Sequence, residues 1–268
     1  LLQLYDGYGD RKFIGKRVAS SSIILETLGY NKAKKIIVHS KWCRNSLVND
    51  YGISEKKIIV ILPGANLDED LYQLWADKRK IDKNNSNTET LKLVFIGKHP
   101  KRKGLDRLIY AFRIVSELGY PISLRVIGCN KDDLDIDIPN SKYDKNIEWV
   151  GMVDKIKYPE SYFSLVGDCD VGCLLSSAEA GGISIREFHA LGLAVIYPKV
   201  GGSPEHAILD ASIGVETDLP NIDIAKILVN FCSDRKLLDK LKRKSWESRN
   251  TMLNSHTVSL ISKEFDKL

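Results

Sequence analysis

The feature that most constrains the fold is a regular alternation of short apolar runs with helical segments over residues 91–215. In the predicted helix 105–118, apolar side chains recur at helical spacing along one face. Such alternation is typical of βαβ units and predicts an α/β fold with a doubly wound parallel sheet. The expected strands are 91–97, 124–128, 147–150, 171–175, 194–197 and 213–215, and the expected helices are 105–118, one around Tyr162, one that opens within 179–187 and runs to about Leu191, and 204–208.

The first part of the chain predicts shorter elements of the same kind. We expect strands at 1–5, 36–38 and 58–62 and a helix at 19–28, with a glycine-containing loop at 6–10. Ser40 is expected to cap a helix that runs to about Asn49. Residues 68–90 are polar and most loop-like at 84–87, which predicts a linker between two domains. Residues 222–268 read as charged helices.

Composition limits the classes of protein that this chain resembles. Its 268 residues are 43% apolar and 28% charged, as in ordinary globular proteins. The net charge of +5 and pI near 8.8 admit an acidic ligand or an anionic membrane surface, but do not argue for nucleic acid. No apolar run reaches the ~18 residues of a membrane span. The five cysteines lack metal-type spacing, which indicates reduced thiols in a cytoplasmic protein.

The segment 179–187, Glu-Ala-Gly-Gly-Ile-Ser-Ile-Arg-Glu, follows a predicted buried strand and opens a helix. In a parallel sheet this turn lies at the carboxyl ends of the strands, where ligands bind. Glycines allow a ligand close to the backbone, and the free N–H groups of a helix start attract anions. Glu179 and Glu187 bracket this turn. The segment therefore suits a ligand with a negative group and hydroxyls, such as a sugar nucleotide.

A second candidate is the loop 97–104, Gly-Lys-His-Pro-Lys-Arg-Lys-Gly, between a strand and a helix. Its cations suit a diphosphate, since lysine stabilises the charge that builds as a phosphate leaves. The loop lacks the Gly-Lys-Ser/Thr ending of a P-loop, so an ATPase is not indicated. Taken alone, a solvated basic loop explains the segment equally well.

Several polar residues have structural explanations. Ser184 and Glu187 fit a capping box, with Ser184 as N-cap. Asp168-Cys169-Asp170 is expected to enter the following strand rather than to hold a metal. Residues 132–137 lack the glycine and closing glutamate of a calcium loop. His189 is expected at the edge of its helix, and the scattered histidines indicate no metal site.

The motifs together resemble those of retaining glycosyltransferases of family 4. The resemblance rests on Glu179-x7-Glu187, the segments 95–98 and 103–106, the strand 147–151, Ala190-Leu191-Gly192-Leu193-Ala194-Val195-Ile196, Gly201-Gly202-Ser203-Pro204-Glu205, and the segments 34–47 and 60–66. In two places the chain departs from the family pattern. Lys98 stands where arginine is commoner, and Tyr5 stands where many relatives have histidine.

This resemblance implies a two-domain GT-B fold with Rossmann-like domains. Residues 1–68 would be the remainder of the amino-terminal, acceptor-side domain, which is expected to lack roughly its first hundred residues. A linker at 69–90, a nucleotide-sugar-binding domain at 91–250 and a helix at 251–268 that returns to the amino-terminal domain would follow.

The resemblance also implies roles at the donor site. Lys98 and Lys103 would contact the diphosphate and, with Glu179, act in catalysis, while Glu187 would hold the ribose hydroxyls. The substrate-binding residues would be Gly97, Lys98, Lys103, Val150, Glu179, Gly182, Ile183, Ser184 and Glu187. Transfer would need no metal or other cofactor.

We therefore expect a cytoplasmic hexosyltransferase that uses a nucleoside-diphosphate sugar and a glycan or lipid-linked acceptor. The alternatives are a binding module without turnover, or a nucleotide-sugar epimerase of the same fold. Lys236, Lys240, Lys242, Arg243 and Lys244 form a basic cluster. It is either a solvated helical face or a peripheral contact with the inner membrane surface.

Overall fold

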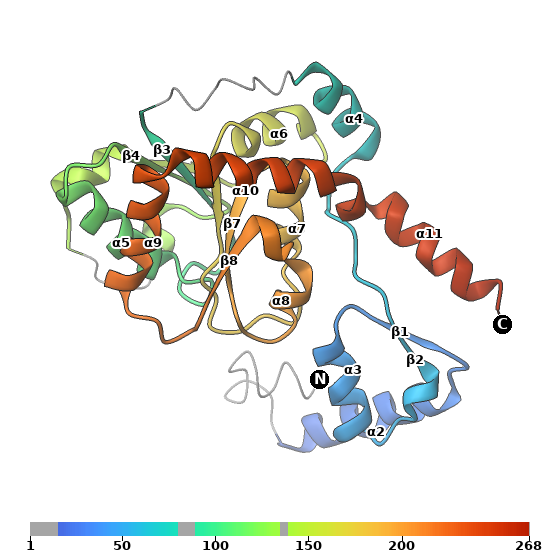
Figure 1. The fold of residues 1–268 in the computed structure, drawn as a ribbon. Coiled ribbons are helices and arrows are strands. Elements are labelled where there is room, and N and C mark those ends of the chain that lie inside the picture. Colours follow the sequence, from blue (N-terminus) through green and yellow to red (C-terminus); the bar gives the residue numbers. More distant parts are fainter. Residues whose placement is uncertain (1–15, 80–88, 135–138, 268) are drawn as a thin grey trace.

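A six-stranded, wholly parallel sheet organises most of the molecule (Figure 1). The computed structural model describes residues 16–79, 89–134 and 139–267. The strands lie in the order β5-β4-β3-β6-β7-β8. Their bounds are β3 Leu91–Ile96, β4 Ile122–Ile127, β5 Ile147–Gly151, β6 Val171–Cys173, β7 Ala194–Pro198 and β8 Ser212–Val215. All six predicted strands of this region are confirmed, and so is the doubly wound fold.

The strand order contains one point at which the chain changes direction. From β3 the chain proceeds outward through β4 to β5, and it then returns to β6, on the other side of β3, and proceeds to β8. The connections from β3 and β6 therefore diverge at neighbouring carboxyl ends. In an open α/β sheet such a switch point leaves a crevice in which ligands bind. The two candidate segments of the sequence, 97–104 and 179–187, follow these two strands along the chain.

Helices cover both faces of the large sheet and define two cores. One core joins the sheet to α5 and α9 through Leu108, Phe112 and Phe231. The other joins it to α4, α6 and α7 through Tyr72, Phe163 and Phe188. The α-helices that follow β2 along the chain are α4 Glu69–Lys78, α5 Leu105–Glu117, α6 Pro159–Gly167, α7 Ile183–Ala190, α8 Ser203–His206, α9 Asn221–Ser233, α10 Arg235–Ser248 and α11 Asn254–Phe265.

The amino-terminal elements form a small unit of their own. Strands β1 (Ile36–Val38) and β2 (Ile58–Val60) pair in parallel, and the helices α2 (Lys16–Lys32) and α3 (Lys41–Asn49) accompany them. Ser40 caps α3 as predicted, because its hydroxyl accepts a hydrogen bond from the Cys43 amide at 3.1 Å. The strand expected at 1–5, the loop 6–10 with Tyr5 before it, the segment 84–87 and residues 135–137 lie outside the described residues.

The polar stretch expected as a linker begins with a helix. Helix α4 packs on α6, and the buried Tyr72 hydroxyl donates to the Ala190 carbonyl at 2.6 Å. The Arg79 guanidinium stacks on Trp75 and Trp246, with its central carbon 4.9 and 5.5 Å from the ring centroids. These contacts fix the start of the expected linker against the large sheet's helices.

The segment that follows β2 and the segment around the start of α11 are hydrogen-bonded to each other. The Ala65 amide donates to the Met252 carbonyl at 2.6 Å, and the Thr257 hydroxyl donates to the Leu62 carbonyl at 2.9 Å. Gly64 permits this approach, because a Cβ atom there would lie 2.3 Å from the Asn254 nitrogen. Helix α11 then extends outward from the helices of the large sheet (Figure 1).

Two composition-based expectations can be compared with the structure. No disulfide joins any of the cysteines, all of which lie in the described ranges. Across residues 16–79, 89–134 and 139–267, no helix combines the length and apolarity needed to cross a membrane.

Candidate active site

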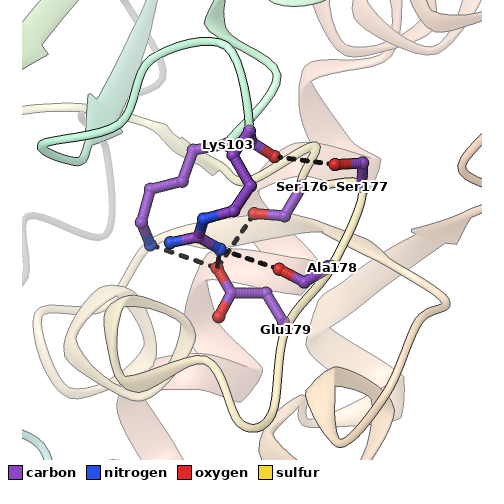
Figure 2. A network of polar contacts seen from close by, with 6 residues as sticks. Lys103, Ser176, Ser177, Ala178 and Glu179 are labelled. Carbon is purple, nitrogen blue, oxygen red and sulfur yellow. Dashed lines mark hydrogen bonds and ion pairs between the residues drawn. The ribbon is translucent and has the colours of Figure 1, made fainter. Parts of the chain in front are cut away.

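The two candidate loops meet at the switch point of the large sheet. Three side chains converge on one carboxylate oxygen there (Figure 2). Glu179 Oε1 lies 3.2 Å from Lys103 Nζ, 3.4 Å from Arg102 Nη1 and 2.9 Å from Ser176 Oγ. Glu179 is only 8% exposed, so solvent screens these charges less than it would on the surface. The structure thus brings together Lys103 and Glu179, which the sequence places 76 positions apart.

Backbone hydrogen bonds tie the two loops to each other beneath these charges. The amides of Leu175 and Ser177 donate to the carbonyls of Lys103 and Arg102, at 3.2 and 2.9 Å. Arg102 Nη1 also donates to the Ala178 carbonyl at 2.8 Å (Figure 2). The relative position of the cations and Glu179 is therefore set by main-chain contacts as well as by charge.

Two glycines of the basic loop are explained by close packing. A Cβ atom on Gly97 would lie 2.3 Å from the Lys103 side chain, so Gly97 leaves room for the lysine stem. Gly104 has φ of 74°, and a Cβ atom there would lie 2.3 Å from the Leu175 carbonyl oxygen. A side chain at Gly104 would push the loop away from the Leu175 backbone, whereas one at Gly97 would displace the Lys103 side chain.

Helix α7 begins at the candidate site, but its cap differs from the predicted capping box. The N-cap is Gly182, with φ of 138°, and no side chain caps the helix. Ile183 is the first helical residue and is exposed. Ser184 lies one residue into the helix, and its buried hydroxyl has no hydrogen-bond partner among the described residues. Prediction of Ser184 as N-cap was wrong, because the glycine backbone reaches a conformation that starts the helix earlier.

Glu187 has tertiary partners instead of a capping role. Its Oε1 accepts from Lys155 Nζ and its Oε2 from the Tyr162 hydroxyl, both at 2.5 Å. The residue is 2% exposed. Burial and the Glu187 charge raise the pKa of Tyr162 well above its usual range, which keeps the phenol protonated as a donor.

An open cavity of about 800 Å³ adjoins the basic loop. It is lined by residues that follow several parallel strands, namely Lys98, His99, Pro100, Lys101, Arg102, Gly128, Asp133, Met152 and Ser177. Among the described residues, neither Lys98 nor Lys101 forms an ion pair. The cavity is large enough for a nucleotide-sized ligand, and its cations suit an anionic one. Val150 lies partly buried in β5, packed against the core rather than lining this cavity.

The amino-terminal unit touches the loop that carries Glu179. The Ser40 hydroxyl lies 3.3 Å from the Ala180 carbonyl, and His206 Nε2 lies 3.1 Å from the His39 carbonyl. Glu205 accepts hydrogen bonds from the Lys41 amide at 2.7 and 2.9 Å, where α3 begins. The candidate site therefore lies beside the contact between the two sheets.

Several polar residues outside the site have structural roles. The Asp170 carboxylate accepts hydrogen bonds from the Lys92 amide at 3.0 Å and from Lys242 Nζ at 2.6 Å, which confirms its expected place at the strand entry. The prediction for His189 was wrong, because this side chain is fully buried and bonded to Ser245 at 2.7 Å. Burial, with the charge of Arg186, lowers the pKa of His189 to about 3. No metal-binding group of acidic, histidine or cysteine side chains occurs in the described ranges.

Sequence reasoning missed three residues of this site as individual participants. Arg102 was counted only among the loop cations, although it contacts Glu179. Lys155 and Tyr162 were not predicted to contact Glu187. Lys155 lies in the segment between β5 and α6 and Tyr162 lies in α6, so both are distant from Glu187 in the sequence. The strand-end position of the loop before α6 was the only available signal for Lys155.

The strand order and the polar residues at the switch point define a doubly wound α/β protein with a candidate site for an anionic ligand at its strand ends. The family model described as "Glycosyl transferases group 1" matches residues 76–247. Since this is more than half of the chain, the protein belongs to that family. Helix α4 contributes its last residues to the matched region.

Curated relatives are distant and longer. A protein of Klebsiella pneumoniae, named as an uncharacterized 41.2 kDa protein in the cps region, is 25% identical over 85% of this chain and 53% of its own length. The D-inositol 3-phosphate glycosyltransferase of Corynebacterium aurimucosum is 26% identical over 69% of this chain and 45% of its own length. The chain thus spans about half the length of the curated relatives that it matches.

Solved structures share the fold. Anabaena HepE in complex with UDP-glucose superposes with a TM-score of 0.70, at 17% identity, over 92% of this chain and 68% of HepE. A glycosyltransferase of Rickettsia africae gives a TM-score of 0.64, at 18% identity, over 90% of this chain and 66% of its own. These similarities confirm the GT-B architecture predicted from the motifs.

Proposed function

We propose that this chain is the donor-binding part of a retaining, family 4 glycosyltransferase. It would move a hexose from a nucleoside-diphosphate sugar to a glycan or lipid-linked acceptor. The observation that carries the proposal is the meeting of Lys103, Arg102 and Glu179 at the switch point of the sheet. The loop cations, the buried carboxylate and the start of α7 would together provide for a diphosphate and sugar hydroxyls at this end of the sheet.

In this proposal the cations neutralise the departing nucleoside diphosphate. Lys103, held 3.2 Å from Glu179, and Lys98 at the cavity wall would contact the phosphate oxygens. Their fixed charges would stabilise the negative charge that develops as the glycosidic bond breaks. No metal is required for this role, and none is assigned.

The other residues would orient the donor. The backbone at Gly182, Ile183 and Ser184 begins α7, and the N–H groups of this helix start would donate to a phosphate of the donor. The partnerless Ser184 hydroxyl offers one more hydrogen bond. Glu179 would accept from the sugar hydroxyls and Glu187 from the ribose. Gly97 would contribute by admitting the Lys103 stem, and Val150, which packs against the core, would support β5.

The domain boundaries and cellular setting belong to the same proposal. Residues 1–68 would form part of an acceptor-side domain, 69–90 the connection, 91–250 the donor domain and 251–268 the returning helix. Work on a lipid-linked acceptor would place the protein at the cytoplasmic face of a membrane. Of the basic cluster on α10, Lys242 is engaged by Asp170, while Lys244 pairs with Glu247 at 3.0 Å.

Thermal-shift measurements with UDP, GDP, ADP and their hexose conjugates test the proposal. A ligand at 100-fold over its dissociation constant stabilises by about 2.7 kcal/mol, which is a measurable rise in melting temperature. We expect one nucleotide to give this shift with or without EDTA, and Lys103→Ala and Glu187→Ala to reduce it. Absence of a shift with every nucleotide would refute the proposed donor site.

Turnover needs a separate assay. Release of free sugar from the bound conjugate, or transfer to an acceptor with retained anomeric configuration, would identify an enzyme. Binding that is strong but without either reaction would instead favour a nucleotide-sugar-binding module.

A further inference from the structure

Glu187 is held by two donors of different character. Tyr162, which donates to Oε2, is 2% exposed and lies inside the core between α6 and α7. Lys155, which donates to Oε1, comes from the segment between β5 and α6, and its side chain is 28% exposed. One carboxylate oxygen therefore faces the core, while the other faces a cation that has access to solvent.

The environment of Lys155 allows it to leave this oxygen. It lies on a turn in which Asp154 Oδ1 accepts the amides of Ile156 and Lys157, at 3.1 and 3.0 Å. Ile156, the next residue, is 91% exposed. A lysine ammonium on a flexible four-carbon stem can move without disturbing the turn, whereas a buried tyrosine cannot. Tyr162 thus keeps Glu187 oriented while Lys155 covers it.

We propose that Lys155 occupies the Glu187 oxygen that the donor ribose needs, and so determines how strongly the site distinguishes ribose from deoxyribose. This inference rests on the proposed role of Glu187 as the ribose acceptor. With Glu187 2% exposed, a ribose hydroxyl reaches Oε1 only if Lys155 yields its place. Binding then exchanges one hydrogen bond for another instead of adding one, which lowers the gain from each ribose hydroxyl.

The test compares Lys155→Ala with Lys157→Ala, a matched control. Lys157 belongs to the same turn and lies over an aromatic ring, 5.1 Å from the Tyr158 centroid, just as Lys155 lies 5.1 Å from the Tyr162 centroid. Each variant removes one positive charge from the turn. Only Lys155→Ala removes a partner of Glu187.

The dissociation constants are measured by calorimetry for UDP and 2′-deoxy-UDP, or for the GDP or ADP pair if that base binds the wild type. We expect Lys155→Ala to bind the ribonucleotide about three- to tenfold more tightly, since a hydrogen bond to a charged carboxylate is gained rather than exchanged. Affinity for the 2′-deoxy form should stay nearly constant, so that the ratio between the two rises by the same factor. Lys157→Ala should leave this ratio unchanged.

Other outcomes overturn the inference. Equal changes with ribose and deoxyribose, or weaker binding of the ribonucleotide alone, would show that Lys155 supports Glu187 instead of covering it. Lys155→Met keeps the aliphatic stem beside Tyr162, and it replaces the alanine variant if that one melts early. If the wild type binds no nucleotide, the proposed function fails, whereas normal wild-type binding with an unaltered ratio in both lysine variants refutes only the role of Lys155.

Discussion

Gly172 in β6 determines how closely the site helix α7 approaches the sheet, and its replacement by alanine provides a quantitative test. A Cβ atom at Gly172 would lie 2.2 Å from Cγ of Phe188, whose ring is fully buried. Such a distance requires the ring or the helix to move. Overpacking of this kind costs about 1–3 kcal/mol. At about 2–4 °C per kcal/mol for a domain of this size, we expect Gly172→Ala to melt about 2–12 °C below the wild type.

Differential scanning calorimetry of the wild type, the two single variants and the double variant separates the clash from other effects. Phe188→Leu removes ring atoms opposite Gly172, so the double variant should lose less stability than the two single losses predict, by about 0.5–3 kcal/mol. Gly29→Ala is the matched control, because nothing lies within 4 Å of a Cβ atom at that helical position. A Gly172→Ala protein that melts with the wild type, or purely additive losses, would refute this explanation of the packing.

Three further predictions concern the supports of the site. Because burial lowers the pKa of His189 to about 3, the unfolded chain binds more protons below its ordinary pKa of about 6.5, and stability falls as pH drops from there. The free energy of unfolding, measured with urea, should therefore decrease between pH 7 and pH 5.5 in the wild type. In His189→Gln this decrease should be smaller by up to about 1.4 kcal/mol. Tyr72→Phe leaves the buried Ala190 carbonyl without this donor and should lower the free energy of unfolding by about 1–3 kcal/mol in urea titrations. Glu205→Ala removes the acceptor at the start of α3, at a cost of about 0.5–2 kcal/mol, and should speed hydrogen exchange of the Lys41 amide.

Each of these predictions has a control on an exposed residue of the same type. His256→Gln, Tyr110→Phe and Glu216→Ala alter side chains that lie at the surface. The reasoning fails if His189→Gln keeps the full pH slope, if Tyr72→Phe is as stable as Tyr110→Phe, or if the Lys41 amide exchanges at the wild-type rate in Glu205→Ala.

The large sheet was predictable because its signals are local. Apolar runs such as 91–97 and 171–175 are bounded by glycine, proline or polar residues, and the order of strand and helix alone implies parallel βαβ units. The positions of the basic loop and of Glu179 at strand ends follow from the same pattern. Their meeting at the switch point was therefore within reach of the sequence.

The features that the sequence did not reveal depend on tertiary contacts. The segment 69–78 is polar enough to look like a linker, but Tyr72 and Trp75 pack on distant helices and stabilise it as α4. Glu187 matches a capping box locally, yet Lys155 and Tyr162 bind its carboxylate. The role that a local motif predicts for a side chain can be replaced by tertiary contacts, because a buried polar group needs partners in the folded protein.

The hydrogen bonds between the connecting segment and the start of α11 limit the ways in which the amino-terminal unit can move. A single covalent connection would leave that unit free to rotate about several axes. Here the Ala65 amide is bonded to the Met252 carbonyl, and Thr257 adds a second bond to Leu62, so the connection is held at two places. Any rotation that remains and that parts Ser40 from Ala180 would also change the contacts of the loop that carries Glu179.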